Sequence, residues 1–295
     1  MSRRAVITGA TGLIGQALSA HLRAAGWSVQ GVSRSAPDAI RWDLAKGTID
    51  GAAFEGVDAV VHLAGESVAG RWSEDKKRRI MESRVKGTTL IAKTLAKLQR
   101  PPSVLVSASA TGYYGDRGGQ HLTEEAGPGE GFLAEVCVAW EGSAAPAADA
   151  GIRVVHPRIG IVMAREGGAL GAMKLPFKMG VGGKIGSGEQ LMSWVHVDDV
   201  VRMIAFAIER AELSGAFNAV APAPISNVAF TKTLGKVLSR PTFLPLPGAM
   251  AKLAMGEAAD EMLLSSTGAV PAVLESLGFE WRYPELRAAL KAALD

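Results

Sequence analysis

The stretch Arg4-Ala5-Val6-Ile7-Thr8-Gly9-Ala10-Thr11-Gly12-Leu13-Ile14-Gly15-Gln16 decides the fold. Its apolar run 5–7 predicts a buried strand, and apolar residues at helical spacing follow the glycines. A GxxGxxG turn lets the backbone approach a phosphate and aims the N–H groups of a helix N-terminus at the anion. A second strand at 28–32 supplies the context that this motif requires. We predict a dinucleotide cradle, with a ligand-free βα turn as the alternative. Its candidate contacts are Gly9, Thr11, Gly12, Leu13, Ile14 and Gly15.

The end of the second strand, Ser33-Arg34-Ser35, indicates which dinucleotide fits. An acidic residue there would accept from the ribose 2′-hydroxyl of NAD and repel a 2′-phosphate. The sequence has no acid at this place, while Ser33 offers a hydroxyl and Arg34 a planar guanidinium suited to phosphate. We therefore predict NADP(H) as the cofactor. The alternative is that Arg34 is an ordinary surface charge.

The next two strands add further candidate contacts. Asp43 closes a short strand at 40–43 and is a candidate for the adenine amino group, or else a turn residue. A fourth strand within 58–65 stops at small residues, which leave space for a ligand at the carboxyl end of a parallel strand. The candidate contacts at this end are Leu63, Ala64, Gly65 and Glu66.

Strands and helices then alternate along the chain. We predict a helix at 73–98, a strand at 103–107, a helix at 132–148 and a strand at 152–155. This alternation predicts an α/β fold, a Rossmann doubly wound parallel sheet with right-handed crossovers. Ser107 and Pro157, at the ends of the fifth and sixth strands, complete the candidate cofactor contacts.

The character of the chain changes after residue 165. Residues 166–189 are rich in glycine and are predicted to form a long loop or lid. Asp198 or Asp199 is expected to cap a helix at 200–208, and His196 is expected to be structural. We predict an NADP-binding Rossmann domain at 1–165, to which 191–220 returns. A smaller, mostly helical substrate lobe is predicted at 166–190 and 221–295, with a helix at 227–238 and a last helix at 284–294.

Across nearly its whole length the chain resembles the extended and atypical short-chain dehydrogenases/reductases. More narrowly, it is similar to an epimerase-like subfamily with a short C-terminal domain of unknown function. The motifs that carry this resemblance are Gly9-Ala-Thr-Gly12-Leu-Ile-Gly15, Ser33-Arg34, His62-Leu-Ala-Gly65-Glu66, Ser83-Arg84-Val85-Lys86-Gly87-Thr88, the run 186–198 and Gly278-Phe279. The resemblance implies NADP(H) binding through Ser33, Arg34, Leu63, Ala64 and Arg84.

The resemblance also implies catalysis by a Ser, Tyr and Lys set, in which the tyrosine moves the hydroxyl proton. Relatives place the tyrosine and lysine as YxxxK, on the helix that follows the fifth strand. Here those positions read Leu133 and Cys137, or Phe132 and Val136 in the neighbouring register, so neither has a phenol or an amine. Only the serine remains, as Ser109.

Two phenols lie near that serine and are candidate replacements, Tyr113 and Tyr114. Ser109 or Thr111 would assist them. An ordinary phenol has a pKa of about 10 and is a poor base at neutral pH. It can still act as an acid or orient a carbonyl. The candidate catalytic residues are Ser109, Tyr113 and Tyr114, and we single out no metal ligands.

Composition limits the remaining classes of function. The chain has 295 residues, 48% of them hydrophobic, with a net charge of +3 and one cysteine. The basic run 76–79 is flanked by acids and predicts a solvated helix face rather than a nucleic-acid site. No apolar run suggests a membrane span or a leader. Cys137, in an apolar stretch, is expected to be buried and not a nucleophile. We expect a cytoplasmic protein with a small-molecule substrate, and a homodimer is consistent with the resemblance.

Two functions remain open. The first is an NADP(H)-dependent oxidoreductase or epimerase that acts on a small carbonyl or hydroxyl compound, or on a substrate like a nucleotide sugar. The second is a catalytically silent module that senses NADP(H) and signals to a protein partner.

Overall fold

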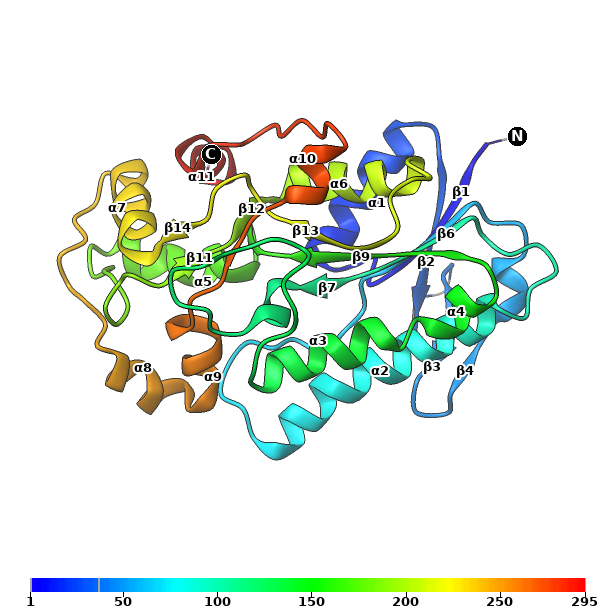
Figure 1. The fold of residues 1–295 in the computed structure, drawn as a ribbon, viewed down its shortest axis with the longest axis horizontal. Coiled ribbons are helices and arrows are strands. Elements are labelled where there is room, and N and C mark those ends of the chain that lie inside the picture. The colour runs from blue at the N-terminus through cyan, green and yellow to red at the C-terminus, as the bar shows by residue number, and fades with distance from the viewer. Residues whose placement is uncertain (1, 37, 295) are drawn as a thin grey trace.

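The computed structural model describes residues 2–36 and 38–294 and has a central, mostly parallel sheet (Figure 1). Neighbouring strands run parallel except β3 and β4, which form an antiparallel hairpin at one edge. The predicted α/β fold is confirmed. In spatial order the strands are β13 (Gly215–Ala219), β9 (Arg153–Ile159), β6 (Val104–Ser107), β5 (Ala59–His62), β1 (Arg4–Thr8), β2 (Ser28–Ser33), β3 (Ile40–Asp43) and β4 (Thr48–Ile49), and β7 (Ser109–Ala110) also pairs with β9.

Helices cover both faces of this sheet (Figure 1). One face holds α1 (Leu13–Ala24), α6 (Val197–Glu209) and α10 (Ala272–Ser276). The other holds α2 (Glu74–Leu95), α3 (Phe132–Gly142) and α4 (Ala145–Asp149). Each face of the sheet has its own hydrophobic core, and alternate residues of β1 belong to each, because strand side chains alternate between faces. Ile7 packs in the same core as Leu18 of α1, and Val6 in the same core as Ile91 of α2.

The remaining elements gather beyond one end of the sheet, on the left in Figure 1. The helices are α5 (Gly168–Lys178), α7 (Asn227–Leu238), α8 (Gly248–Met255), α9 (Glu257–Ala259), the single π-helical turn η3 (Asp260–Leu264) and α11 (Leu286–Leu294). Short strand pairs join β10 (Ile161–Met163) to β12 (Trp194–His196), β11 (Leu191–Met192) to β14 (Ile225–Ser226), and β8 (His121–Leu122) to β15 (Gly268–Ala269). Their core includes Phe177, Phe230 and Leu290. β13 joins the main sheet, while the division into two domains stays a prediction.

The predicted long loop at 166–189 is wrong in its first half, which forms α5. Leu170 and Phe177 are spaced by two helical turns and are both buried against the same core. The glycines around them obscured that spacing. Pro176 lies in the last turn of the helix and has no N–H group, so it donates no backbone hydrogen bond there.

The predicted helix at 132–148 is two helices, because α3 ends at Gly142 and α4 begins at Ala145. Pro146 cannot donate a backbone hydrogen bond, so the first helix does not continue through it.

β9 is longer than predicted and contains Pro157. On one side of β9 this proline lies where the ladder passes from β6 at Val155 to β7 at Arg158, and on the other side it pairs in register with Phe217 of β13.

The predicted aspartate cap of α6 is also wrong. The side chain of His196 is the cap, and its Nδ1 accepts from the backbone N–H of Asp198 at 3.2 Å. The carboxylate of Asp199 instead accepts from the backbone N–H groups of Arg282 and Tyr283, at 2.7 and 2.9 Å. Asp199 therefore holds the C-terminal segment against helix α6. Among the described residues, no helix combines the length and the apolar composition that a membrane crossing requires.

Candidate functional site

The glycine turn between β1 and α1 is built for close approach. Gly9 has φ +68°, and a Cβ on Gly15 would lie 2.1 Å from the carbonyl oxygen of Gly9. Gly12 is the N-cap of α1 and supplies no side-chain hydrogen bond to it. Within the part of the chain that the structure describes, no side chain caps this helix, so its first N–H groups are left for an anion. Thr11 and Gly12 are exposed, and Leu13 and Ile14 are half-buried.

A buried histidine fixes the strand end beside this turn. The hydroxyl of Thr8 accepts from the backbone N–H groups of Leu63 and Ala64, at 3.1 and 3.2 Å. Its own proton is therefore donated to Nδ1 of His62, 2.7 Å away. Burial, followed by the charge of Arg84, lowers the pKa of His62 to about 4, so the ring is neutral and carries its proton on Nε2. In the sequence His62 stands out only as part of a motif that carries the resemblance.

Arg84 lies behind the loop that follows β5. Its Nη1 donates to the carbonyl oxygens of Glu66 and Ile80, at 3.0 and 3.2 Å, and its guanidinium stacks 4.8 Å from the ring centroid of Trp140. Burial lowers the pKa of Arg84. A Cβ on Gly65 would come within 3.3 Å of its guanidinium carbon. Arg84 thus supports the backbone of the predicted cofactor contacts.

The side chain of Glu66 is committed to helix α2. It forms an ion pair of 2.9 Å with Lys76, and this hydrogen bond lowers the pKa of Glu66. Its backbone N–H donates to the hydroxyl of Ser83. The predicted contact through Glu66 is therefore available only through its backbone or by breaking this pair.

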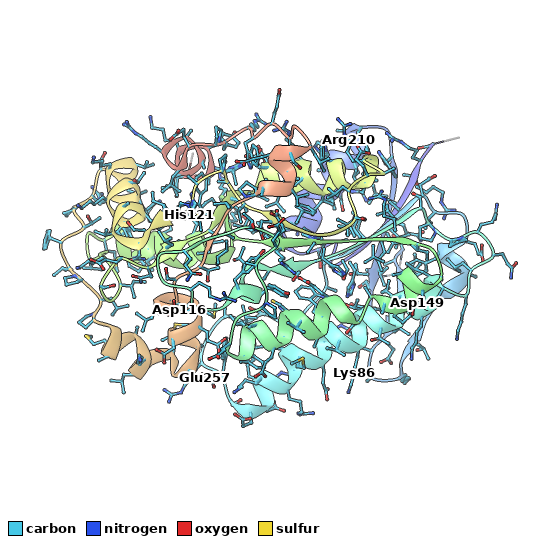
Figure 2. All side chains as sticks on the ribbon, in the orientation of Figure 1. Lys86, Asp116, His121, Asp149, Arg210 and Glu257 are labelled. Atoms are coloured by element: carbon cyan, nitrogen blue, oxygen red, sulfur yellow. The ribbon has the colours of Figure 1, made fainter. Side chains whose placement is uncertain are left out.

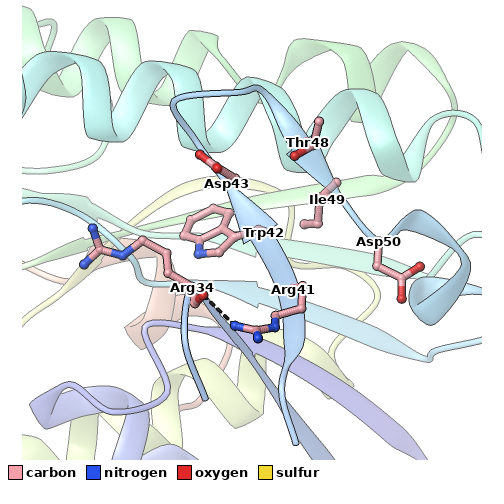
Figure 3. Close-up of a pocket in the computed structure, with 7 residues that line it drawn as sticks. All are labelled: Arg34, Arg41, Trp42, Asp43, Thr48, Ile49 and Asp50. Carbon is pink, nitrogen blue, oxygen red and sulfur yellow. Dashed lines mark hydrogen bonds between the residues drawn. The ribbon is translucent and has the colours of Figure 1, made fainter. Parts of the chain in front are cut away.

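The end of β2 opens into a cavity of about 460 Å³ that includes Arg34 and Asp43 (Figure 3). The hydroxyl of Ser33 accepts from the backbone N–H groups of Ser35 and Ala36 and so orders the loop after the strand. Asp43 acts as a turn residue, because its Oδ1 accepts from the backbone N–H groups of Ala45 and Lys46. Its second carboxylate oxygen lies 3.8 Å from Nζ of Lys46, and the adenine contact through Asp43 stays a prediction.

The candidate catalytic residue Ser109 belongs to a buried charge network. Its hydroxyl donates to Oε1 of Glu141 at 2.6 Å. Arg158 binds both oxygens of that carboxylate, each at 2.9 Å, and it also donates to the hydroxyl of Tyr114 at 3.0 Å. Burial opposes the charge of Arg158, yet its bonds to Glu141 raise the pKa of Arg158 above its usual value.

Full burial removes Tyr114 from the catalytic candidates, which corrects the expectation from sequence. The side chain is 0% exposed, and its hydroxyl donates to Oδ1 of Asn218 at 2.8 Å. Burial raises the pKa of Tyr114. Tyr113, by contrast, is half-buried, and the guanidinium of Arg158 lies 3.4 Å from its ring centroid.

Helix α3 places Leu133 and Cys137 against the same loop. A Cβ on Gly112 would lie 3.2 Å from Cβ of Leu133, and the thiol of Cys137 approaches the carbonyl oxygen of Ala110 at 3.7 Å. Burial raises the pKa of Cys137 to about 11. The predicted burial of this thiol is confirmed.

A second cavity, of about 220 Å³, lies where this loop meets the C-terminal segment. Gly112, Gly115 and Leu133 form one wall, and residues 260–267 contribute the other. The carboxylate of Glu261 accepts from the backbone N–H groups of Phe132 and Leu133 at 2.8 and 2.7 Å, and so caps α3 from a distant part of the chain. The acidic residues that line the cavity are Asp116 (labelled in Figure 2), Glu130, Asp260 and Glu261.

The structure thus brings most predicted contacts to the end of the sheet where the parallel strands have their carboxyl ends. Ser107 ends β6 beside His62 in register, and its buried hydroxyl has no partner among the described residues. Glu141, Arg158 and Glu261 are not among the site residues that the sequence predicts. Their partners are distant in sequence, and no local pattern announces such pairs.

Comparisons with known proteins agree with this geometry. Residues 5–219 match the model of the NAD dependent epimerase/dehydratase family, and residues 246–293 match a domain of unknown function. An epimerase family protein of Mycobacterium bovis is 41% identical over 288 residues, which cover 96% of this chain and 95% of that protein. The crystal structure of human epimerase family protein SDR39U1 with NADPH is 36% identical, has a TM-score of 0.91 and covers 99% of both chains. A UDP-glucose 4-epimerase of Thermus thermophilus is 19% identical with a TM-score of 0.79, which shows a shared fold alone.

Proposed function

Because the chain belongs to the NAD-dependent epimerase/dehydratase family, we propose that it is an NADP(H)-dependent oxidoreductase of the epimerase type that acts on a small carbonyl or hydroxyl compound. The observation that carries this proposal is the second cavity. It is lined by Gly112 and Gly115 of the loop that bears Tyr113, and this loop follows β6, one of the parallel strands whose carboxyl ends hold the ligand in folds of this kind.

The residues present fit NADP(H). Gly15 packs so closely against the carbonyl oxygen of Gly9 that no side chain fits between them, which keeps the turn tight. The exposed Gly12 begins α1, whose first N–H groups would face the pyrophosphate. Ser33 and Arg34 would hold the 2′-phosphate, since no carboxylate replaces them at the end of β2. The human relative crystallised with NADPH supports the same choice.

The charges of the second cavity favour a small neutral substrate over one like a nucleotide sugar. Its lining contains four carboxylic acids and no lysine or arginine. A diphosphate entering such a space would meet like charge without a cation to offset it. Ser265 and Thr267 add hydroxyl oxygens. Their protons are donated to the carbonyl oxygens of Glu261 and Gly115, so the two oxygens are left to accept from a hydroxyl group of the substrate.

The bound nicotinamide would supply or accept hydride, and a side chain of the protein would donate or accept the proton. Ser109 already donates its proton to Glu141, and Tyr114 is sealed inside the loop. Tyr113 is therefore the proposed proton donor for carbonyl reduction, held by the guanidinium of Arg158 against its ring. Leu133 lines the cavity and would help to exclude water from the reacting groups.

Stopped-flow absorbance at the nicotinamide band tests the proposal. Protein with bound NADPH is mixed with a panel of small aldehydes and ketones and, separately, with nucleotide sugars. We expect oxidation by a member of the first panel, and a loss of about a hundredfold in that rate for Tyr113→Phe. Tyr283→Phe, which changes a phenol stacked on His196, is the matched control and should keep the rate. If no compound oxidises bound NADPH, the enzymatic proposal fails.

The alternative function, a sensor of NADP(H), is favoured by one specific observation. Leu133 and Cys137 occupy the face of α3 where relatives carry their phenol and amine, and the thiol is buried. A sensor would bind a protein partner differently with and without NADPH. A pull-down with the tagged protein in both states tests this idea, and equal capture in the two states would contradict it.

A further inference from the structure

Arg41 lies beside the residues that are expected to bind the 2′-phosphate. β2 and β3 are parallel, and Arg41 pairs in register with Ser33, the residue before Arg34. Paired residues of neighbouring strands project from the same face of a sheet. The side chain of Arg41 therefore projects from the face on which the Ser33 hydroxyl lies, at the end of the sheet where the cofactor binds.

Within the described part of the chain, the guanidinium of Arg41 is held in place by a single hydrogen bond, and most of its N–H groups remain free to bind a ligand. One of its amino groups, Nη1, donates to the carbonyl oxygen of Arg34 at 2.7 Å (Figure 3). An arginine has five N–H donors, so most of them are left for a ligand. Arg41 is exposed, and no ion pair between the described residues includes either Arg34 or Arg41.

The acids nearby do not neutralise this pair of arginines. Asp43 and Asp50 line the same cavity. Oδ1 of Asp43 accepts from two backbone N–H groups, and its Oδ2 lies 3.8 Å from Nζ of Lys46. Asp50 meets Arg41 through the backbone, where its N–H donates to the carbonyl oxygen of Arg41 at 3.1 Å.

We propose that Arg41 is a second phosphate-binding residue, which contacts the phosphomonoester on the adenosine ribose of NADP(H) and also positions Arg34. The inference rests on the proposed NADP(H) binding and adds a specificity-determining residue to it. A phosphomonoester carries close to two negative charges at neutral pH, which two guanidinium groups match better than one. The hydrogen bond to the Arg34 carbonyl keeps the backbone of the first arginine in place while its side chain closes on the phosphate.

Two substitutions separate charge from positioning. Arg41→Gln removes the charge but retains an N–H donor that can reach the Arg34 carbonyl. Arg41→Ala removes both. Arg100→Gln is the matched control, since this arginine lies at the opposite end of the sheet, next to Gly56.

Titration calorimetry with NADPH, NADH, 2′,5′-ADP and 5′-ADP reads out binding without catalysis. For Arg41→Gln we expect roughly a tenfold or greater loss of affinity for NADPH and for 2′,5′-ADP, with NADH and 5′-ADP changed by less than about twofold. Arg41→Ala should lose more, because Arg34 is then also released. The control variant should bind all four as the wild type does.

The outcomes separate this inference from the proposed function. A wild type that binds neither NADPH nor NADH overturns both. A wild type that prefers NADPH, with an unchanged preference in Arg41→Gln, overturns the role of Arg41 alone. An equal loss for NADPH and NADH would also overturn it, because it would indicate a disturbed loop rather than a lost phosphate contact.

Discussion

Arg158 and Glu141 form a two-pronged ion pair inside the protein, with both nitrogen-to-oxygen distances at 2.9 Å. The arginine side chain is 6% exposed and the glutamate side chain 15%. The same two residues hold Ser109 and Tyr114, so this one pair supports the whole loop that faces the second cavity. Its chief role is therefore to position that loop.

Glu141→Gln should destabilise the protein by roughly 3 kcal/mol, because it leaves the charge of Arg158 buried without a counter-charge. The free energy of unfolding in urea measures this. Glu82→Gln is the control, since it breaks an exposed pair with Lys86 and should cost no more than about 0.5 kcal/mol. Equal losses in the two variants would contradict the role assigned to the buried pair.

His62 should make stability fall in mild acid. Its pKa is about 4 in the folded protein, against an ordinary value of 6.5. The folded state therefore favours the neutral ring. This stabilisation, roughly 3 kcal/mol, is fully present above pH 6.5 and is lost as the pH falls from 6.5 towards 4.

His62→Asn keeps an acceptor for Thr8 and removes the titration. Urea unfolding at pH 4.5, 5.5, 6.5 and 7.5 should show a shallower acid loss in this variant than in the wild type, although the other buried histidines still contribute. His21→Asn, at an exposed position of α1, should keep the wild-type slope. Parallel slopes in His62→Asn and the wild type would show that the ring does not titrate as described.

Gly15→Ala should abolish dinucleotide binding, because its methyl group would overlap the carbonyl oxygen of Gly9 and push the turn open. Gly142→Ala, in helix α3, meets nothing within 4 Å and should bind as the wild type does. Nucleotide binding followed by fluorescence compares the two variants. Retained affinity in Gly15→Ala would place the pyrophosphate elsewhere.

Arg34→Asp should weaken NADPH by roughly a hundredfold and NADH by less than about twofold, since it replaces a phosphate-binding cation with a like charge. Titration calorimetry of both nucleotides gives the ratio. An unchanged preference would return Arg34 to the status of a surface charge, the alternative that its sequence context left open.

The sequence predicted those features whose cause is local. The β1 strand, the glycine turn and helix α7 follow from periodicity within a few residues, and Asn227–Leu238 was predicted with its observed ends. α5 was missed because glycines interrupt the spacing of Leu170 and Phe177, which tertiary burial nonetheless makes helical. The β3–β4 hairpin was missed because its second strand has only two residues.

The sequence predicts those parts of the site whose contacting residues lie close together along the chain or at the ends of predicted strands. The cofactor contacts recur at strand ends, and the parallel fold brings strand ends together. Tyr113 and Tyr114 differ by one position, yet one is sealed against Asn218 and the other faces Arg158. The partners on β9 and β13 decide which phenol is buried, and these strands are more than 35 residues away in the sequence, so no local pattern predicts the contact.

Titration calorimetry of the purified protein with NADPH and with NADH tests the central claim most directly. We expect one site per chain that binds NADPH at least roughly tenfold more tightly than NADH, because the extra phosphate meets a guanidinium at the end of β2. Absence of heat with both nucleotides, or a preference for NADH, would contradict the account.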